Sequence, residues 1–222
     1  MVIAVSDLGM PKTARRATAR PPGAQVDFQR LLGPTAWAAL PAAVQARFGL
    51  HADSYRCCYD GQMVVRASPA GWLLAQLCRL IGTPLAPWTG EAVPTGVDVW
   101  LDEEGALVWD RLYRFIGHPP VLVSSRKTAS EGGGLLEVVR GGFGMALDVS
   151  VEDGALHFRS SRYFVSLGRR RLTIPALITP GQAHVIHRDE GGGRFRFTLS
   201  FHHPLLRRTF YQDGMFADPP EG

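Results

Sequence analysis

RFRFTLSF, residues 194–201, carries the clearest pattern in the chain, because apolar and polar residues alternate in it without a break. Phe195, Phe197, Leu199 and Phe201 fall on one side of an extended chain, and the residues between them fall on the other. This period of two predicts a strand with one buried face. A face with three phenylalanines must cover either helices or a cavity, and that choice decides what the protein can do.

The same alternation recurs on both sides of this stretch, and it predicts a long sheet of many short strands. The glycine runs 132–134 and 191–193 are expected to be hairpin loops, since neither a Lys-Ser/Thr pair nor a helix follows them, as a phosphate-binding loop requires. Residues 83–96 and 169–182 are expected to be loops, the second crossing one mouth of the sheet. The other expected strands lie at 55–59 and 63–66, joined by a turn at Asp60-Gly61, and at 97–101, 107–115, 121–125, 135–140, 143–151, 156–158, 185–187 and 210–216.

Helical patterns precede the sheet and interrupt it once. Residues 26–32, 36–40 and 42–48 are expected to form three short helices, ended by glycine or proline. The strongest helical pattern covers 70–81, where Ser68 is a good N-cap and Pro69 suits the first helical position. Its apolar stripe consists of Leu73, Leu74, Leu77, Leu80 and Ile81.

These elements predict an α+β fold that is mostly β: a curved antiparallel sheet, or a half or full barrel, that encloses a cavity and is covered by the N-terminal helices. The chain of 222 residues is long enough for one domain with a sizeable core, and its high glycine and proline content suits many turns. We expect a disordered basic tail at 1–24, a single β-rich domain at 25–217 and a short tail at 218–222.

The net charge of +4 is weak evidence for a nucleic-acid partner, because residues 1–24 alone hold a balance of +3. Arg194, Arg196 and His202 form a basic stripe, but the aromatic residues of that strand lie on its opposite face and cannot interleave with it for base stacking. We therefore expect no nucleic-acid partner. No apolar run approaches the roughly 18 residues of a membrane span, so none is expected.

The three cysteines, Cys57, Cys58 and Cys78, form neither an even disulfide framework nor a metal-binding spacing. A reducing compartment, the cytoplasm, is the expected location. We expect neither a bound metal nor another cofactor, because no C-x-x-C or H-x-x-x-H pair is present.

The parity of strand 107–115 places an arginine inside the sheet. If the strand is regular, Leu107, Trp109, Arg111, Tyr113 and Phe115 share one face, which is the more apolar of the two. Because a guanidinium stays charged, a buried Arg111 needs a partner, and we expect Glu137 to supply it from the strand 135–140. Such a pair is either an acid–base site in a cavity or a structural ion pair, and the sequence leaves both open.

Other side chains are candidates for the same cavity. Tyr113, Tyr211 and His203 are expected to add groups that move protons, with Arg111 and Glu137 as the centre of the site. A structural role for His203, bonded to backbone at a strand end, is the alternative. The expected ligand-binding residues are Trp109, Phe115, Ser124, Phe197 and Phe201.

The order of several short segments resembles the family of proteins with domain of unknown function 4166. This resemblance covers residues 26–216, almost the whole body of the chain, and implies that Trp109, Arg111, Glu137 and Tyr211 are pattern positions of that family. It also implies that members stand alone or follow oxidoreductase domains similar to saccharopine dehydrogenase, and it implies no activity. The segments are FQRLLG (28–33) with Leu40-Pro41, LIGTP (80–84), WDR (109–111) with Phe115, GLLE (134–137), EDGAL (152–156), LTIP (172–175), RFRF (194–197), and PLL (204–206) with Tyr211 and Gly214.

The sequence thus favours a small-molecule enzyme of secondary or lipid metabolism. It would act on an apolar substrate by metal-free acid–base chemistry, such as a cyclisation or an isomerisation. Two alternatives stay open: a non-catalytic protein that binds a hydrophobic ligand, and an accessory domain that docks on an oxidoreductase. Converging ionisable groups in the cavity would favour the enzyme, whereas a broad apolar patch outside would favour docking.

Overall fold

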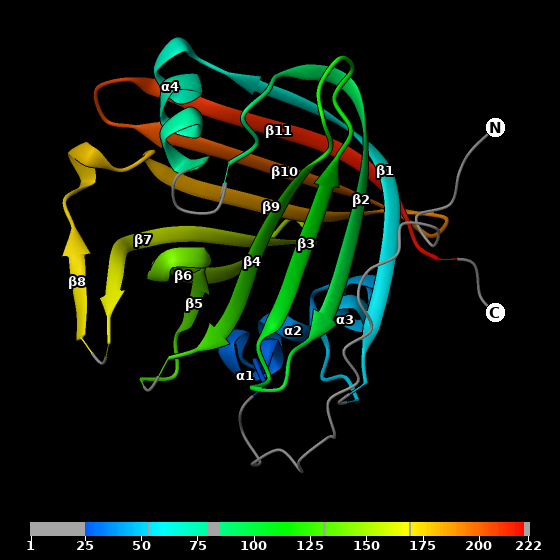
Figure 1. Cartoon of the computed structure of the whole chain (residues 1–222). Coiled ribbons are helices and arrows are strands. Elements are labelled where there is room, and N and C mark those ends of the chain that lie inside the picture. Colours follow the sequence, from blue (N-terminus) through cyan, green and yellow to red (C-terminus); the bar gives the residue numbers. More distant parts are fainter. Residues whose placement is uncertain (1–24, 53, 80–84, 131, 169, 220–222) are drawn as a thin grey trace.

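Eleven antiparallel strands form one sheet in the computed structural model, which describes residues 25–52, 54–79, 85–130, 132–168 and 170–219 (Figure 1). Their order is β6-β5-β4-β3-β2-β1-β11-β10-β9-β7-β8, and β6 also pairs with β7. This pairing closes ten of the strands into a barrel, with β8 outside the ring as the hairpin partner of β7. The predicted fold, mostly β and antiparallel, is confirmed in its closed form.

The strands are β1 (Arg56–Ala67), β2 (Gly90–Leu101), β3 (Leu107–Tyr113), β4 (Val121–Ala129), β5 (Leu135–Val138), β6 (Phe143–Glu152), β7 (Ala155–Leu167), β8 (Arg170–Ile174), β9 (Gln182–Gly191), β10 (Arg194–His203) and β11 (Arg207–Ala217). The helices are α1 (Phe28–Leu32), α2 (Pro34–Ala38), α3 (Ala42–Phe48) and α4 (Pro69–Cys78), with short 3₁₀ turns η3 (Arg140–Gly142) and η4 (Ala176–Ile178). The predicted tail 1–24 lies outside the described residues.

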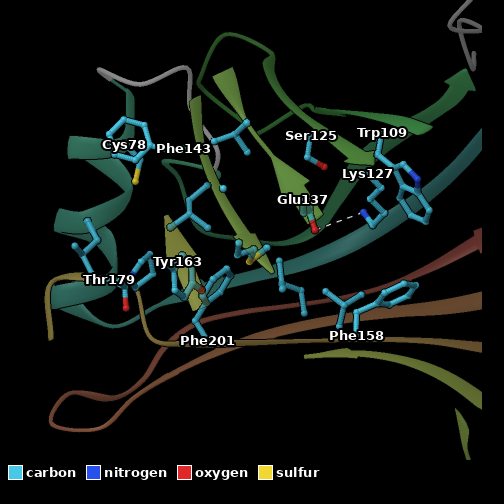
Figure 2. Close-up of a pocket in the computed structure, with 18 of the residues that line it drawn as sticks. Cys78, Trp109, Ser125, Lys127, Glu137, Phe143, Phe158, Tyr163, Thr179 and Phe201 are labelled. Atoms are coloured by element: carbon cyan, nitrogen blue, oxygen red, sulfur yellow. Dashed lines mark ion pairs between the residues drawn. The ribbon is translucent and has the colours of Figure 1, made fainter. Parts of the chain in front are cut away.

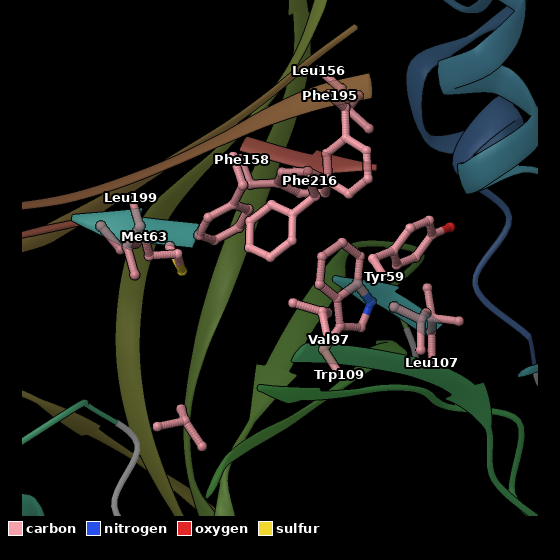
Figure 3. Close-up of a cluster of buried hydrophobic side chains, with 14 of the residues drawn as sticks. Tyr59, Met63, Val97, Leu107, Trp109, Leu156, Phe158, Phe195, Leu199 and Phe216 are labelled. Carbon is pink, nitrogen blue, oxygen red and sulfur yellow. The ribbon is translucent and has the colours of Figure 1, made fainter. Parts of the chain in front are cut away.

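The alternating stretch that predicts the sheet is β10, and its four apolar side chains are buried inside the barrel. At one end they join an aromatic core with residues of α1 and α3. Phe28 and Phe48 pack edge to face, with ring centroids 5.3 Å apart, and both contact Phe158 of β7. Figure 3 shows the part of this core that surrounds Trp109 and Phe195. Helices α1–α3 therefore close one end of the barrel (Figure 1).

Helix α4 lies toward the opposite end, against β11 (Figure 1). As predicted, Ser68 caps it by accepting a hydrogen bond from the backbone N–H of Gly71. Gly71 also allows the close approach to β11, because a Cβ there would lie 1.8 Å from the carbonyl oxygen of Thr209. The predicted apolar stripe faces outward in part, since Leu73 and Leu77 are exposed, whereas Leu80 and Ile81 lie outside the described residues.

Several strand predictions were wrong in their extent. The expected hairpin at Asp60-Gly61 is instead the middle of the continuous strand β1, which pairs with β2 on one side and β11 on the other. Part of the expected loop 83–96 belongs to β2, and part of the expected loop 169–182 forms β8 and η4. Strand β4 continues four residues beyond the predicted end at Ser125, which brings Lys127 into the sheet.

Gly61 is required in β1 because the backbone and a ring press on it. A Cβ at this position would lie 2.2 Å from the carbonyl oxygen of Met215 and 2.6 Å from the ring of Phe216. Gly61→Ala should therefore lower the free energy of unfolding by about 2 kcal/mol, measured by urea titration. Gly132→Ala is the control, since the nearest atom to its Cβ is 4.0 Å away. Equal stability of the two variants would contradict the assigned β1–β11 register.

Candidate functional site

The barrel encloses a cavity of about 390 Å³ between its interior face, α4 and the segment around η4 (Figure 2). This volume lies in the range of sites for small organic ligands. Most of the wall is apolar and comes from α4, β6, β7, β9 and β10. The apolar lining residues are Leu74, Leu77, Leu85, Val139, Phe143, Met145, Phe158, Ile174, Ile178, Pro180, Val185, Phe197, Leu199 and Phe201.

The mouth of the cavity lies between α4 and η4. Leu77 of α4 and Ile178 of η4 both line the cavity and are more than half exposed to solvent. The inner end of the cavity lies toward α3. A small space of about 20 Å³ next to Phe48 adjoins it there, and the two share four lining residues: Trp109, Arg111, His187 and Phe197. A ligand would enter beside α4 and reach the aromatic core with its leading end.

Three neighbouring strands place a cluster of polar side chains on this wall. Trp109 of β3 is opposite Ser125 of β4, and Lys127 of β4 is opposite Glu137 of β5. Arg111 follows Trp109 by two residues and so points to the same face. The alternation of each strand therefore brings two cations, one carboxylate and one hydroxyl together inside the barrel.

Direct contacts connect the members of this cluster. The ammonium of Lys127 lies 3.5 Å from Oε2 of Glu137, and both side chains are almost fully buried (Figure 2). Nη2 of Arg111 donates to Oγ of Ser125 at 3.1 Å, and Ser125 hydrogen-bonds to Glu137. The ammonium of Lys127 also lies 4.5 Å from the centre of the Trp109 ring, a cation–π contact.

Electrostatics keep Glu137 ionised. Burial by itself would raise its pKa, but the charges of Lys127 and Arg111 and the hydrogen bond from Ser125 outweigh burial and lower the pKa below its usual value. Burial lowers the pKa of Lys127, an effect that Glu137 opposes and Arg111 reinforces. The cluster therefore presents an ionised carboxylate, which is a weaker base than a free glutamate, next to an ammonium that gives up its proton more readily than a free lysine.

The other titratable groups on the wall are neutral at physiological pH. Burial, with the nearby charge of Arg47, lowers the pKa of His187 to about 3. Burial raises the pKa of Tyr163, whose hydroxyl donates to the carbonyl oxygen of Gly181 at 2.7 Å. Burial also raises the pKa of Cys78. Two cations and one carboxylate thus leave the wall with one net positive charge.

Five predicted site residues do line the cavity: Trp109, Arg111, Glu137, Phe197 and Phe201. The expected pairing within the site differs, however. The ion partner of Glu137 is Lys127, whereas Arg111 acts on the carboxylate through its charge and through Ser125. The reason is the length of β4, which extends past the predicted end and inserts Lys127 between the strands of the two expected partners.

Two other predicted residues share the inward face but belong to the packed core. Tyr113 is fully buried, and its hydroxyl donates to Oε1 of Gln212 at 3.1 Å instead of reaching the cavity. Phe115 lies beyond the end of β3 and stacks on the Tyr113 ring, 5.8 Å away. Neither lines the cavity.

The remaining three predicted residues face elsewhere. Ser124 is on the outer face of β4, because the strand places Ser125 inward. Tyr211 is on the outer face of β11, where the guanidinium of Arg208 lies 5.0 Å from its ring centre. His203 has the structural role that was its alternative: Nδ1 accepts from the N–H groups of Leu205 and Leu206, and Nε2 bonds to the carbonyl oxygen of Leu177.

Sequence reasoning missed Ser125, Lys127, Tyr163 and His187 as cavity residues. The alternation Val123, Ser125, Lys127 continues through β4 and was the available signal for the first two. From sequence alone, a lysine near a strand end is expected to be exposed at the surface unless a buried carboxylate partner is known.

The closed barrel and its polar cluster define a β-barrel domain with a ligand-sized, mostly apolar cavity. A family model described as domain of unknown function (DUF4166) matches residues 40–216, and the chain belongs to this family. No curated protein matches the chain, and no solved structure does. Among the described residues, no helix is long and apolar enough to cross a membrane.

The cluster predicts an asymmetric response to substitution. Glu137→Gln leaves two buried cations without a carboxylate, whereas Lys127→Met leaves Glu137 facing Arg111. We expect Glu137→Gln to cost about 3 kcal/mol of unfolding free energy at neutral pH and Lys127→Met distinctly less. Urea titration of both variants measures the difference. The reverse order would show that Arg111 does not share the charge of Glu137.

The same cluster predicts a pH dependence. The lowered pKa of Glu137 means that its ionised form stabilises the fold fully above its ordinary pKa of 4.5, and that this stability is lost as the pH falls through the pKa in the folded state. The difference in unfolding free energy between wild type and Glu137→Gln should therefore shrink between about pH 5 and about pH 3. A difference that stays constant over this range would contradict an ionised Glu137.

Proposed function

We propose that this protein binds an apolar small molecule in the barrel and moves a proton on it, in an isomerisation or cyclisation. One observation carries the proposal: the buried cluster of Arg111, Lys127 and Glu137 borders an open cavity of about 390 Å³ instead of being covered by side chains. A purely structural ion pair needs no such space beside it. Acid–base catalysis uses groups of different proton affinity that are held in place beside the substrate.

Each charged side chain has a role in this proposal. Glu137 accepts a proton from a carbon next to a carbonyl group, and Arg111 and Lys127 stabilise the negative charge that develops on the carbonyl oxygen. The proton held by Glu137 exchanges with solvent, and Glu137 then delivers a proton to another position of the substrate, so that atoms and electrons balance without a redox step. Ser125 holds Arg111 and Glu137 in register by bonding to both.

A non-catalytic carrier is the second candidate, and the composition of the wall favours it. Apart from the cluster and a few neutral polar groups, the lining is apolar, which suits passive binding of a hydrophobic ligand. An accessory role beside an oxidoreductase is the third, in keeping with the exposed apolar side chains near the mouth. For all three we propose a reducing compartment such as the cytoplasm, where three free thiols persist.

The first experiment identifies the ligand and asks whether its protons exchange. Protein purified without detergent is extracted with organic solvent, and the extract is analysed by mass spectrometry. The released compound is then returned to the protein in deuterium oxide. We expect deuterium at carbon with wild type and at least about a hundredfold slower incorporation with Glu137→Gln. Binding without exchange would select the carrier and exclude the enzyme.

A pair of neighbouring substitutions controls for the cavity. Val185 lines it, whereas Ile186 is on the outer face of the same strand, and both are partly buried. Val185→Trp should fill the space and abolish co-purification of the ligand, and Ile186→Trp should keep it. A ligand retained equally by both folded variants would place binding outside the barrel.

A further inference from the structure

Three side chains at the inner end of the cavity hold buried nitrogen atoms without a hydrogen-bond partner among the described residues. They are Nε1 of Trp109, Nε of Arg111 and both ring nitrogens of His187. Each of these residues is at most 9% exposed, and all three line both the main cavity and the small space next to it. The unsatisfied groups are therefore gathered at one place.

Such groups are costly unless something pairs with them. A buried donor without a partner loses about 1–3 kcal/mol, and native proteins leave few of them. Trp109 and Arg111 have only donors in their side chains, whereas neutral His187 carries one donor and one acceptor, so donors predominate. What is missing at this end of the cavity is therefore a group of hydrogen-bond acceptors.

The charge of the wall indicates which kind of acceptor group fits. Glu137 is the only acidic side chain among the described residues that line the cavity, and it faces two cations, so that one positive charge is left over. Arg47, on the other side of the small space, is already paired with Asp189 and Asp218. A ligand group with one negative charge and several acceptor atoms would balance both the charge and the donors.

We propose that the ligand is an apolar molecule with a single carboxylate, bound with that carboxylate against Trp109, Arg111 and His187 and with its apolar body toward α4. This inference rests on the proposed function, since it names the class of ligand for the same cavity. The inference also gives the orientation of the ligand, because the hydrogen-bond donors are at the inner end and the apolar lining extends to the mouth.

The test compares two probes of equal chain length, decanoate and decanol, by titration calorimetry. Wild type should bind decanoate at least about tenfold more tightly than decanol. Arg111→Met leaves the Lys127–Glu137 pair intact and makes the wall neutral. The ratio of decanoate affinity to decanol affinity should therefore fall to near one, while decanol still binds. Arg114→Met, a partly buried arginine that does not line the cavity, is the charge-matched control and should keep the preference.

The outcomes separate the two proposals. Equal binding of both probes by wild type, or an unchanged preference in Arg111→Met, overturns the carboxylate and leaves the cavity function standing. If neither probe binds and neither competes with an extracted ligand, both proposals fail. A preference for decylamine over decanoate would reverse the assigned charge of the wall and overturn this inference.

A second surface stands out independently, at the mouth of the cavity. Seven apolar side chains there are between 46% and 74% exposed. Three segments that carry them are held together: His203 joins η4 to the β10–β11 turn, and Thr209 bonds to the carbonyl oxygen of Pro180 and to the N–H of Ser68, the N-cap of α4. We name these seven side chains the mouth rim: Trp72, Leu73, Leu77, Leu177, Ile178, Leu205 and Leu206.

The charged residues that neighbour the mouth rim in the sequence have one sign. Arg79, Arg207 and Arg208 are exposed beside it, and the sequence segments 62–90, 154–188 and 194–212 contain no aspartate or glutamate. Exposed apolar side chains on a helix, a 3₁₀ turn and a hairpin turn, flanked in the sequence by arginine and by no acidic residue, match the interface of an anionic bilayer, where the apolar groups insert and the arginines meet lipid phosphates. The basic segment 1–24 is a poor cover for this surface, because its charge has the same sign.

We infer that the mouth rim docks the barrel on an anionic lipid surface. Its position around the cavity entrance would let an apolar ligand pass between bilayer and barrel without crossing water. The inference concerns docking from outside and holds whether or not the ligand is a carboxylate.

Flotation of the full chain with phosphatidylglycerol vesicles and with phosphatidylcholine vesicles tests the docking. We expect binding to the former, weakened when sodium chloride is raised from about 0.1 M to about 1 M. The double variant Leu205→Ser/Leu206→Ser should lower the bound fraction at least about fivefold. Leu50→Ser/Leu122→Ser, equally exposed leucines away from the rim, should leave it unchanged.

Three results would overturn the inference. One is the absence of binding to phosphatidylglycerol. The second is binding that survives the rim substitutions, which would assign it to the basic segment 1–24. The third is loss of binding in both double variants. Capture of a defined oxidoreductase by the rim, without any vesicle binding, would assign the surface to a protein partner instead.

Discussion

The ladder between β6 and β7 is the constraint on which the rest of the structure depends. Without it the strands would form an open sheet with a free edge; with it, ten strands enclose an interior and every second side chain of each strand faces inward. The alternation of apolar and polar residues in β10 then corresponds to the inner and outer faces of the barrel. One parity of each strand builds the core and the cavity wall, and the other meets solvent.

Closure also explains how charges are tolerated inside the barrel. A buried lysine or glutamate alone would shift its pKa and lose its charge, but β4 and β5 place Lys127 and Glu137 directly opposite each other. Ser125 and Arg111 complete the arrangement from the next positions of the same face. Hydrophobic residues of similar size would fill this space with less desolvation, so the cluster is not the arrangement that stability alone would favour.

Strand parity could be predicted from the sequence, whereas depth within the barrel could not. The pattern of 107–115 correctly placed Trp109 and Arg111 inward. Tyr113 shares that parity, yet its hydroxyl is satisfied by Gln212 from β11, a contact between residues 99 positions apart that no local pattern reveals.

Strand length limited the other predictions. Because β4 was expected to end at Ser125, Lys127 was left out of the expected site, whereas Ser124, which is on the outer face, was included. The glycine of Asp60-Gly61 resembled a turn signal, but it allows the close packing of Phe216 on a continuous strand. Local chemistry predicted which residues can turn or point inward, and long-range pairing decided which of them do.

The polarity of the interior changes in one direction along the cavity. At the inner end lie one excess positive charge and donors that have no hydrogen-bond partner within the described part of the chain. Apolar side chains form the middle, and exposed apolar residues with arginines surround the mouth. A molecule with a polar head and an apolar body fits this gradient in only one orientation, with its head in first. Reversed binding would place the apolar end of the molecule against the donors at the inner end and would leave them without acceptors, which is unfavourable. The gradient thus sets which atoms of a bound molecule can reach Glu137: those next to its polar head.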